Sequence, residues 1–180
     1  MMLPERFGEQ VRIGVALEVP EPFGTALQAA RGRAGDPLAH AIPPHVTLLG
    51  PTVLEPDELE LAVEHLSAVA AEHAPFALHL RGTGTFRPVS PVVFVEVVEG
   101  IAECELLEQG VRSGPLAQPL RFHYHPHVTV AHHVPDESLD WAFAALADFD
   151  ARFVVDGLQV FEHGDDGVWR VVRHVPFTAS

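Results

Sequence analysis

The feature that most constrains this chain is a short motif that occurs twice, a proline followed by His-Val-Thr and then an aliphatic residue. One copy contains His45 and Thr47, and the other contains His127 and Thr129, 82 positions further along. Both copies are rich in residues that favour strands. Since successive side chains of a strand point to opposite faces, the histidine and threonine of each copy share one face. The motif therefore predicts two strands that bury an aliphatic face and turn a His/Thr pair toward a cleft or solvent.

A single His-x-Thr carries little information, but two copies with the same preceding proline and similar aliphatic neighbours are far less expected by chance. Their separation is a little under half of the 180 residues. This pattern indicates an internal duplication, in which two similar lobes each contribute one His/Thr strand. One copy alone would be read as a partly buried strand histidine with a strand-forming threonine, whereas the pair favours a shared site.

The paired motif resembles that of the 2H phosphoesterase superfamily, which includes 2′-5′ RNA ligase-like proteins and RNA 2′,3′-cyclic phosphodiesterases. The resemblance covers nearly the whole chain and implies a fold of two β-rich lobes around a central cleft, with helices outside. Besides the second motif, the segments that carry it are Arg12–Pro20, His45–Gly50, Gly84–Phe86 and Val92–Val97.

Resemblance to this superfamily implies that His45 and His127 are catalytic and that Thr47 and Thr129 bind phosphate. The chemistry agrees with these residue types. Opening a cyclic phosphate by in-line displacement needs one group that takes a proton from water and another that protonates the leaving sugar oxygen. Imidazoles do both near neutral pH, because the unperturbed pKa of histidine is about 6.5. With two hydroxyls donating to phosphate oxygens, such a site needs no metal and no other cofactor.

Composition limits the partners of this chain. Its formal net charge is −14 and no basic stripe is visible, which argues against long nucleic acid but is compatible with one phosphate in a local pocket. All 11 basic residues are arginine. The lack of lysine excludes a ligase that works through a covalent lysyl-nucleotide, and it excludes a Walker-type phosphate loop.

The same composition sets expectations for location. Cys104 is the single cysteine, so the chain has no internal disulfide, which fits a reducing cytoplasm. No apolar run approaches the roughly 20 residues of a membrane span. The first ten residues lack the apolar stretch of a signal peptide. We therefore expect a cytoplasmic monomer without membrane contact.

The hydrophobic periodicity, with the positions of glycine and proline, predicts an α+β fold with largely antiparallel sheets. We expect one bilobal domain over residues 1–180. The first motif strand is expected to end at Gly50-Pro51, and Gly82 and Gly84 are expected to mark a turn. Asp136 is expected to cap a helix. The predicted strands are 11–19, 75–81, 92–98, the two motif copies and a C-terminal hairpin of 151–161 and 168–175, and the predicted helices are 23–33, 56–73, 101–113 and 137–147.

Further residues are candidates for substrate contact. Tyr124 and Phe86 are candidates for stacking on a nucleobase, and Arg87 or Arg121 for neutralising phosphate charge. The simpler interpretations are a core or cleft-wall position for each aromatic residue and a solvated surface position for each arginine.

A histidine-rich run surrounds the second motif: His123, His125 and His127 alternate, and His132 and His133 follow. Imidazole clusters bind Zn, Cu or Ni, but no cysteine accompanies the run and a strand would spread its rings along a ribbon. In an unbroken strand His133 is in phase with His127 and His132 is out of phase. Many superfamily members carry arginine at the position of His132, so the family's role for that arginine is not carried over here.

These observations lead to one hypothesis and two alternatives. The hypothesis is a metal-independent phosphoesterase that hydrolyses the 2′,3′-cyclic phosphate of a small nucleotide or an RNA 3′ end to a 2′-phosphate. The same chemistry with an RNA hydroxyl in place of water would give 2′-5′ ligation. One alternative is a non-catalytic module that binds a nucleotide or RNA end on the same fold, although a pure binder does not need two titrating groups. The other is a metal-binding protein built on the histidine-rich run.

Overall fold

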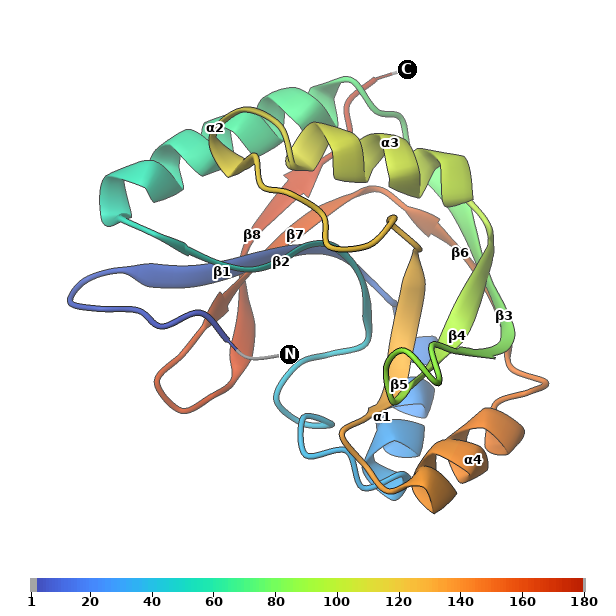
Figure 1. The fold of residues 1–180 in the computed structure, drawn as a ribbon. Helices are drawn as coiled ribbons and strands as arrows, with labels where there is room; N and C mark the ends of the chain where they lie inside the picture. Colours follow the sequence, from blue (N-terminus) through green and yellow to red (C-terminus); the bar gives the residue numbers. More distant parts are fainter. Residues whose placement is uncertain (1–2, 180) are drawn as a thin grey trace.

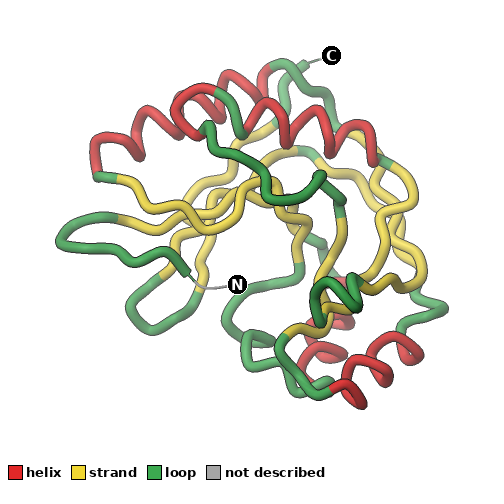
Figure 2. Tube along the Cα trace, viewed as in Figure 1, coloured by secondary structure: helices red, strands yellow, loops and turns green. Residues whose placement is uncertain are grey.

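The computed structural model describes residues 3–179, which form one antiparallel sheet of eight strands with four α-helices packed around it (Figures 1 and 2). The order of the strands across the sheet is β6-β3-β4-β5-β2-β1-β7-β8. The strands are β1 (Val11–Glu18), β2 (His45–Leu54), β3 (Phe76–Thr85), β4 (Val92–Glu99), β5 (His127–His132), β6 (Asp150–Val155), β7 (Gly157–His163) and β8 (Trp169–Pro176). The helices are α1 (Phe23–Arg33), α2 (Pro56–Ala71), α3 (Ile101–Val111) and α4 (Asp136–Ala145), with a short 3₁₀ turn at Gly114–Leu116.

The two copies of the duplicated motif begin the two central strands and divide the sheet into similar halves. β2 is followed outward by β1, β7 and β8, and β5 is followed outward by β4, β3 and β6. Helices α2 and α3 pack against the first half, and α1 and α4 pack against the second (Figure 1). One helix of each half packs on the other half. Helix α1 connects β1 to β2 but packs against β5, and α3 connects β4 to β5 but packs against β2. The predicted α+β fold of two similar, largely antiparallel lobes with outer helices is confirmed.

The aliphatic residues of each motif lie in the core, as their alternation predicts. Val46, Leu48, Val128 and Val130 are at most 2% exposed. At roughly 25 cal/mol per Å² of apolar surface removed from water, this burial holds the central strands in register and leaves the His/Thr face available for function.

A one-residue bulge follows the threonine of each motif at equivalent positions. The pairing of β2 with β1 skips Leu48, and the pairing of β5 with β4 skips Val130. A bulge reverses the alternation of faces beyond it. The second strand is therefore not unbroken, and His132 comes into phase with the motif histidine, while Gly50 takes the equivalent place on β2.

Two strands continue through residues that were predicted to end them. β2 extends beyond Gly50-Pro51, and the register with β1 is irregular at that point, which accommodates a proline that has no N–H to donate. β3 extends through Gly82 and Gly84, and the register with β4 shifts beside Gly82, whose φ of 68° suits glycine. Both corrections have the same cause, since an irregular register lets a strand continue through glycine and proline, which usually end one.

The predicted strand 151–161 is two strands. β6 pairs with β3 and β7 pairs with β1, at opposite ends of the sheet order, although only Asp156 separates them in sequence. The sheet therefore curls until its ends approach each other. The predicted C-terminal hairpin is confirmed for β7 and β8.

Asp136 was expected to cap α4, but it is the first residue of that helix, and the cap is Pro135. Among residues 3–179, no helix is both long and apolar enough to cross a membrane.

Candidate active site

The two central strands are joined by one residue pair, which fixes the relative positions of the motif side chains. Val46 pairs with Val128 in antiparallel register. This register sets His45 opposite Thr129 and Thr47 opposite His127, on the face away from the two valines. The structure thus brings the four predicted residues together with an approximate two-fold relation between the copies.

Each motif imidazole is held by an equivalent hydrogen bond, from Nδ1 to the backbone carbonyl two residues earlier. Nδ1 of His45 lies 2.8 Å from the carbonyl oxygen of Pro43, and Nδ1 of His127 lies 2.6 Å from that of His125. A carbonyl only accepts, so each Nδ1 carries a proton and donates it. Nε2 of each ring is then the atom that takes or gives a proton. The proline between acceptor and histidine in each copy restricts the backbone, which keeps the acceptor in place.

Burial disfavours the charged form of both rings. It lowers the pKa of His45 to about 4, against the raising effect of the hydrogen bond to Pro43, and the charges of Arg31 and His127 lower it further. Burial also lowers the pKa of His127, although its bond to the carbonyl of His125 acts in the opposite direction. Both rings are therefore neutral at pH 7 in the free protein, and an anion bound between them would raise both pKa values.

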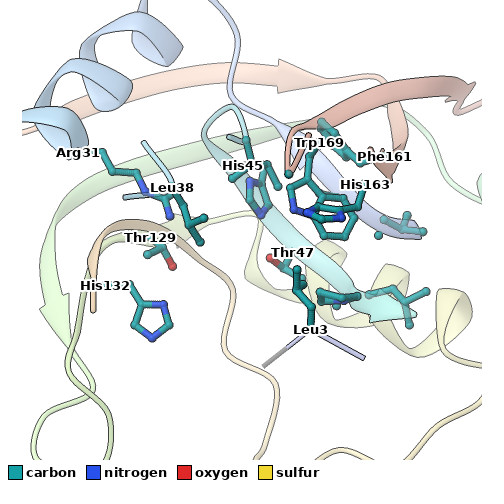
Figure 3. Close-up of a pocket in the computed structure, with 18 of the residues that line it drawn as sticks. Leu3, Arg31, Leu38, His45, Thr47, Thr129, His132, Phe161, His163 and Trp169 are labelled. Carbon is teal, nitrogen blue, oxygen red and sulfur yellow. The ribbon is translucent and has the colours of Figure 1, made fainter. Parts of the chain in front are cut away.

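A cavity of about 310 Å³ lies over the first motif (Figure 3). Its wall includes His45, Thr47 and Thr129. Neither threonine hydroxyl forms a hydrogen bond with another group of residues 3–179, so both are available to a ligand. His127 lies outside this wall, and its ring is packed edge-on against Phe86, with 4.9 Å between ring centroids.

Two ends of the cavity differ in chemistry. Arg31 and His132 lie toward the Thr129 side, and Phe161, His163 and Trp169 lie on the other side of His45 (Figure 3). The first group offers polar N–H donors and the second offers ring faces. The cavity is therefore suited to a ligand with an anionic part and an aromatic part.

Arg31 is a charged residue of the cavity wall that the motif does not identify. It is 5% exposed, and its Nε lies 2.8 Å from Oδ2 of the buried Asp36. The sequence does carry a signal for it, because Phe23, Leu27 and Arg31 are spaced four apart along α1. An arginine on the apolar stripe of a helix is buried only with a partner, which here follows five residues later.

The four residues nominated from the sequence for substrate contact lie away from the cavity wall, and one of them, Arg121, lies over the ring of Phe122, 5.2 Å from its centroid. The hydroxyl of Tyr124 donates to the carbonyl oxygen of Thr47 at 3.0 Å, and Phe86 supports the ring of His127. Arg87 forms an ion pair of 2.7 Å with Asp140. These contacts give each residue a structural partner, and their substrate-binding roles stay predictions.

The histidine-rich run is divided between different surroundings. The rings of His132 and His133 stack with 3.8 Å between centroids, whereas those of His125 and His127 are 6.1 Å apart. Within residues 3–179 no three His, Cys, Asp or Glu side chains are arranged to hold a metal ion. Burial lowers the pKa of His132 to about 4, and the neighbouring His133 lowers it further.

Comparison with known proteins places this chain in a family. The family model of the 2′-5′ RNA ligase superfamily matches residues 19–167. A Halalkalibacterium halodurans protein that is named as a phosphoesterase is 32% identical over 160 residues, which is 88% of this chain and 92% of the relative. A Bacillus cereus protein with the same description is 30% identical over 138 residues, covering 76% of this chain and 80% of the relative.

Solved structures agree on the fold. E. coli LigT in complex with 3′-AMP matches with a TM-score of 0.69 at 17% identity, covering 95% of this chain and 100% of that chain. A crystal structure described only as a phosphoesterase matches with a TM-score of 0.63 at 18% identity, with the same coverage. From the family match, the two relatives and the shared fold, we conclude that this chain belongs to the 2′-5′ RNA ligase superfamily, whose members are 2H phosphoesterases.

Proposed function

We propose that this protein is a metal-independent phosphodiesterase that hydrolyses a 2′,3′-cyclic phosphate, on a nucleotide or an RNA 3′ end, to a 2′-phosphate. The observation that carries the proposal is the identical anchoring of two imidazoles through Nδ1, which leaves two Nε2 atoms for proton transfer beside two threonine hydroxyls. General acid–base catalysis of this reaction needs both groups, whereas a module that only binds needs neither.

In the proposed reaction, the oxygen of a water molecule forms a bond to phosphorus while the bond from phosphorus to O3′ breaks. One imidazole takes a proton from the attacking water, and the other, as imidazolium, gives a proton to O3′. The phosphate stays on O2′, and the two rings have exchanged their protonation states. Thr47 and Thr129 donate to the non-bridging oxygens, where negative charge accumulates in the transition state. With an RNA hydroxyl in place of water, the same steps form a 2′-5′ linkage.

The aromatic end of the cavity supports a nucleoside as the rest of the substrate. The Trp169 ring lies close against β1, since a Cβ at Gly14 would be 3.5 Å from it, an ordinary van der Waals distance. The ring of His163 lies 4.9 Å from that of Trp169, and its Nδ1 is 2.9 Å from Nη1 of Arg12. Such rings suit stacking on a base. The LigT structures are described as complexes with 3′-AMP, NADP⁺ and ATP, which favours nucleotides here.

The test is a panel of 2′,3′-cyclic nucleotides, cyclic-phosphate-ended RNAs and 2′-5′ dinucleotides, assayed with EDTA. His45→Ala and His127→Ala are each expected to lower kcat by about 10²- to 10⁴-fold, the usual effect of losing a positioned proton donor or acceptor. Thr47→Val or Thr129→Val should mainly weaken phosphate binding, by about 1.5–3 kcal/mol. His123→Ala, which alters an exposed histidine near the second motif, is the matched control.

The outcomes separate the alternatives. Turnover that is unchanged in either motif variant would rule out the two-histidine mechanism. Nucleotide binding without any product from the panel would favour the binding module. Activity that EDTA abolishes and Zn²⁺ or Mg²⁺ restores would favour metal chemistry.

A further inference from the structure

Arg31 is a buried charge whose ion pair uses only one of its nitrogens. It lies on the buried face of α1, and its guanidinium reaches the wall of the cavity (Figure 3). Nε donates to Oδ2 of Asp36, and no hydrogen bond joins Nη1 or Nη2 to another group of residues 3–179. A guanidinium has five N–H donors, so four remain for a ligand in the cavity.

Asp36 holds this guanidinium rigidly. Its side chain is 1% exposed and accepts two further hydrogen bonds, from the backbone N–H of Leu38 at 2.8 Å and from that of His132 at 3.1 Å. The carboxylate thereby joins the end of α1, the loop before β2 and the end of β5. Its two oxygens are occupied on the protein side, so Arg31 presents its remaining donors toward the cavity.

The positive charge of Arg31 affects the ionisation of neighbouring residues at the end of the cavity that offers N–H donors. The guanidinium is among the groups that lower the pKa values of His45 and His132, which means that it lies near both rings. Of the arginines in residues 3–179, Arg31 is the one that lines this cavity. In a chain with a formal net charge of −14, it is therefore a local source of positive charge for an anion.

We propose that Arg31 is a phosphate-binding residue of this site, in addition to the two motif threonines. The inference rests on the proposed function in one respect, that a phosphate group occupies the cleft. The planar fork of the guanidinium donates two N–H bonds to non-bridging oxygens and balances their negative charge. Because Asp36 already fixes the guanidinium, little conformational entropy is lost when the anion binds.

The test measures binding of inorganic phosphate by calorimetry and needs no turnover. Arg31→Gln is expected to weaken phosphate binding by about 10- to 100-fold, the effect of losing hydrogen bonds from a charged group. Arg33→Gln is the matched control on the same helix, since the Arg33 guanidinium lies over the ring of Trp141, 4.9 Å from its centroid. This control should bind phosphate like the wild type. Affinity in a folded Arg31→Gln variant within twofold of the wild type would overturn the inference.

Arg31→Gln leaves the buried Asp36 without its charged partner, so the melting temperature of each variant is measured too. If Arg31→Gln does not fold, the side-chain Nε–H NMR signals of the wild type decide. Phosphate should shift the signal of Arg31 and not that of Arg33, and a signal of Arg31 that does not move would overturn the inference. Phosphate binding through Arg31 without hydrolysis of any cyclic phosphate would refute the proposed function and leave this inference standing.

Discussion

The two motif imidazoles lie where their charged forms are disfavoured, which determines the expected pH dependence of the reaction. Burial lowers the pKa of His45 to about 4 and lowers that of His127 from its ordinary value. In the free protein, the state with one neutral and one protonated ring is most populated between the two pKa values. We therefore expect kcat/KM, which reports on the free enzyme, to be highest below pH 6.5.

A bound cyclic phosphate is negatively charged and favours the imidazolium form. The profile of kcat, which reports on the complex, is therefore expected to lie at higher pH than that of kcat/KM. Both profiles should be measured with one cyclic nucleotide over the same buffers. A kcat/KM maximum above pH 7.5, or a kcat profile displaced to lower pH, would contradict the environment described for these rings.

Strand alternation predicts where three of the four motif side chains lie, whereas their catalytic and binding roles stay predictions. His45, Thr47 and Thr129 line the cavity, because alternation along a strand determines which side chains share a face. Arg31 is not predicted, since its place depends on how α1 packs against β5 and on the contact with Asp36. The spacing of Phe23, Leu27 and Arg31 is a local sign that Arg31 lies on the buried face of α1, but only packing between distant segments brings that face to the cavity.

At the scale of strands, the duplicated bulge explains why the expectation that His132 is out of phase with His127 is wrong. Alternation assumes one residue for each residue of the neighbouring strand, and the pairing of β5 with β4 skips Val130. The bulge after Thr47 on β2 is equivalent, so both halves of the sheet repeat the irregularity as well as the motif. The duplication therefore extends to backbone geometry that the pattern of aliphatic residues in the sequence does not reveal.

β3 and β4 form a support for His127 that a single methyl group should disturb. Gly84 on β3 pairs with Phe94 on β4, and a Cβ at Gly84 would lie 2.5 Å from the Phe94 ring. That ring lies 5.0 Å from the ring of His127. Gly84→Ala is expected to displace Phe94, to lower stability by about 1–3 kcal/mol through overpacking, and to lower kcat.

Gly32→Ala is the matched control for this substitution. A Cβ at Gly32 on α1 would meet its nearest neighbour at 3.9 Å, so alanine fits there. Because glycine is unfavourable in a helix interior, this variant should gain about 0.5–1 kcal/mol and keep full kcat. Chemical denaturation and steady-state kinetics measure both effects. A Gly84→Ala variant as stable and active as Gly32→Ala would contradict the proposed support for His127.

The β7–β8 hairpin supplies a natural optical probe of the aromatic end of the cavity. Of the two tryptophans of the chain, Trp169 lines the cavity, whereas Trp141 lies on α4. In a Trp141→Phe variant, a bound nucleotide should quench the remaining fluorescence by stacking, and inorganic phosphate should not. Trp169→Ala should weaken nucleotide binding by about 1–3 kcal/mol. Equal quenching by phosphate and nucleotide would argue against a base on Trp169.

At the scale of the whole molecule, the curled sheet explains both the shared site and the limits of prediction. β6 and β7 are consecutive in sequence yet pair with β3 and β1, far apart in the strand order. Asp156-Gly157 is a local sign of a break between two strands, but no local feature indicates that these strands pair at distant places in the sheet. The curl is a consequence of long-range pairing, whereas the lobes and their central strands follow from the repeated motif.

Four partly buried histidines with lowered pKa values should also make the stability of the molecule sensitive to acid. Burial lowers the pKa values of His45 and His132 to about 4, and it lowers those of His127 and His163 as well. The unfolded chain binds protons on these rings near the unperturbed pKa of about 6.5. Below that pH the unfolded state holds more protons than the folded state, so stability decreases as pH falls from about 6.5 toward 4.

Thermal and urea unfolding in chloride buffers, from pH 7.5 to 5, measures this loss. We expect the free energy of unfolding of the wild type to fall steadily below pH 6.5, and to fall by on the order of 1 kcal/mol less in His45→Asn, which removes one titrating group. Added phosphate should stabilise the wild type more at pH 5.5 than at pH 8, because protonated rings attract the anion and ligand binding adds to stability. A stability that does not change between pH 7 and 5, or an equal effect of phosphate at both pH values, would show that these histidines are not buried in neutral form around an anion-binding cleft.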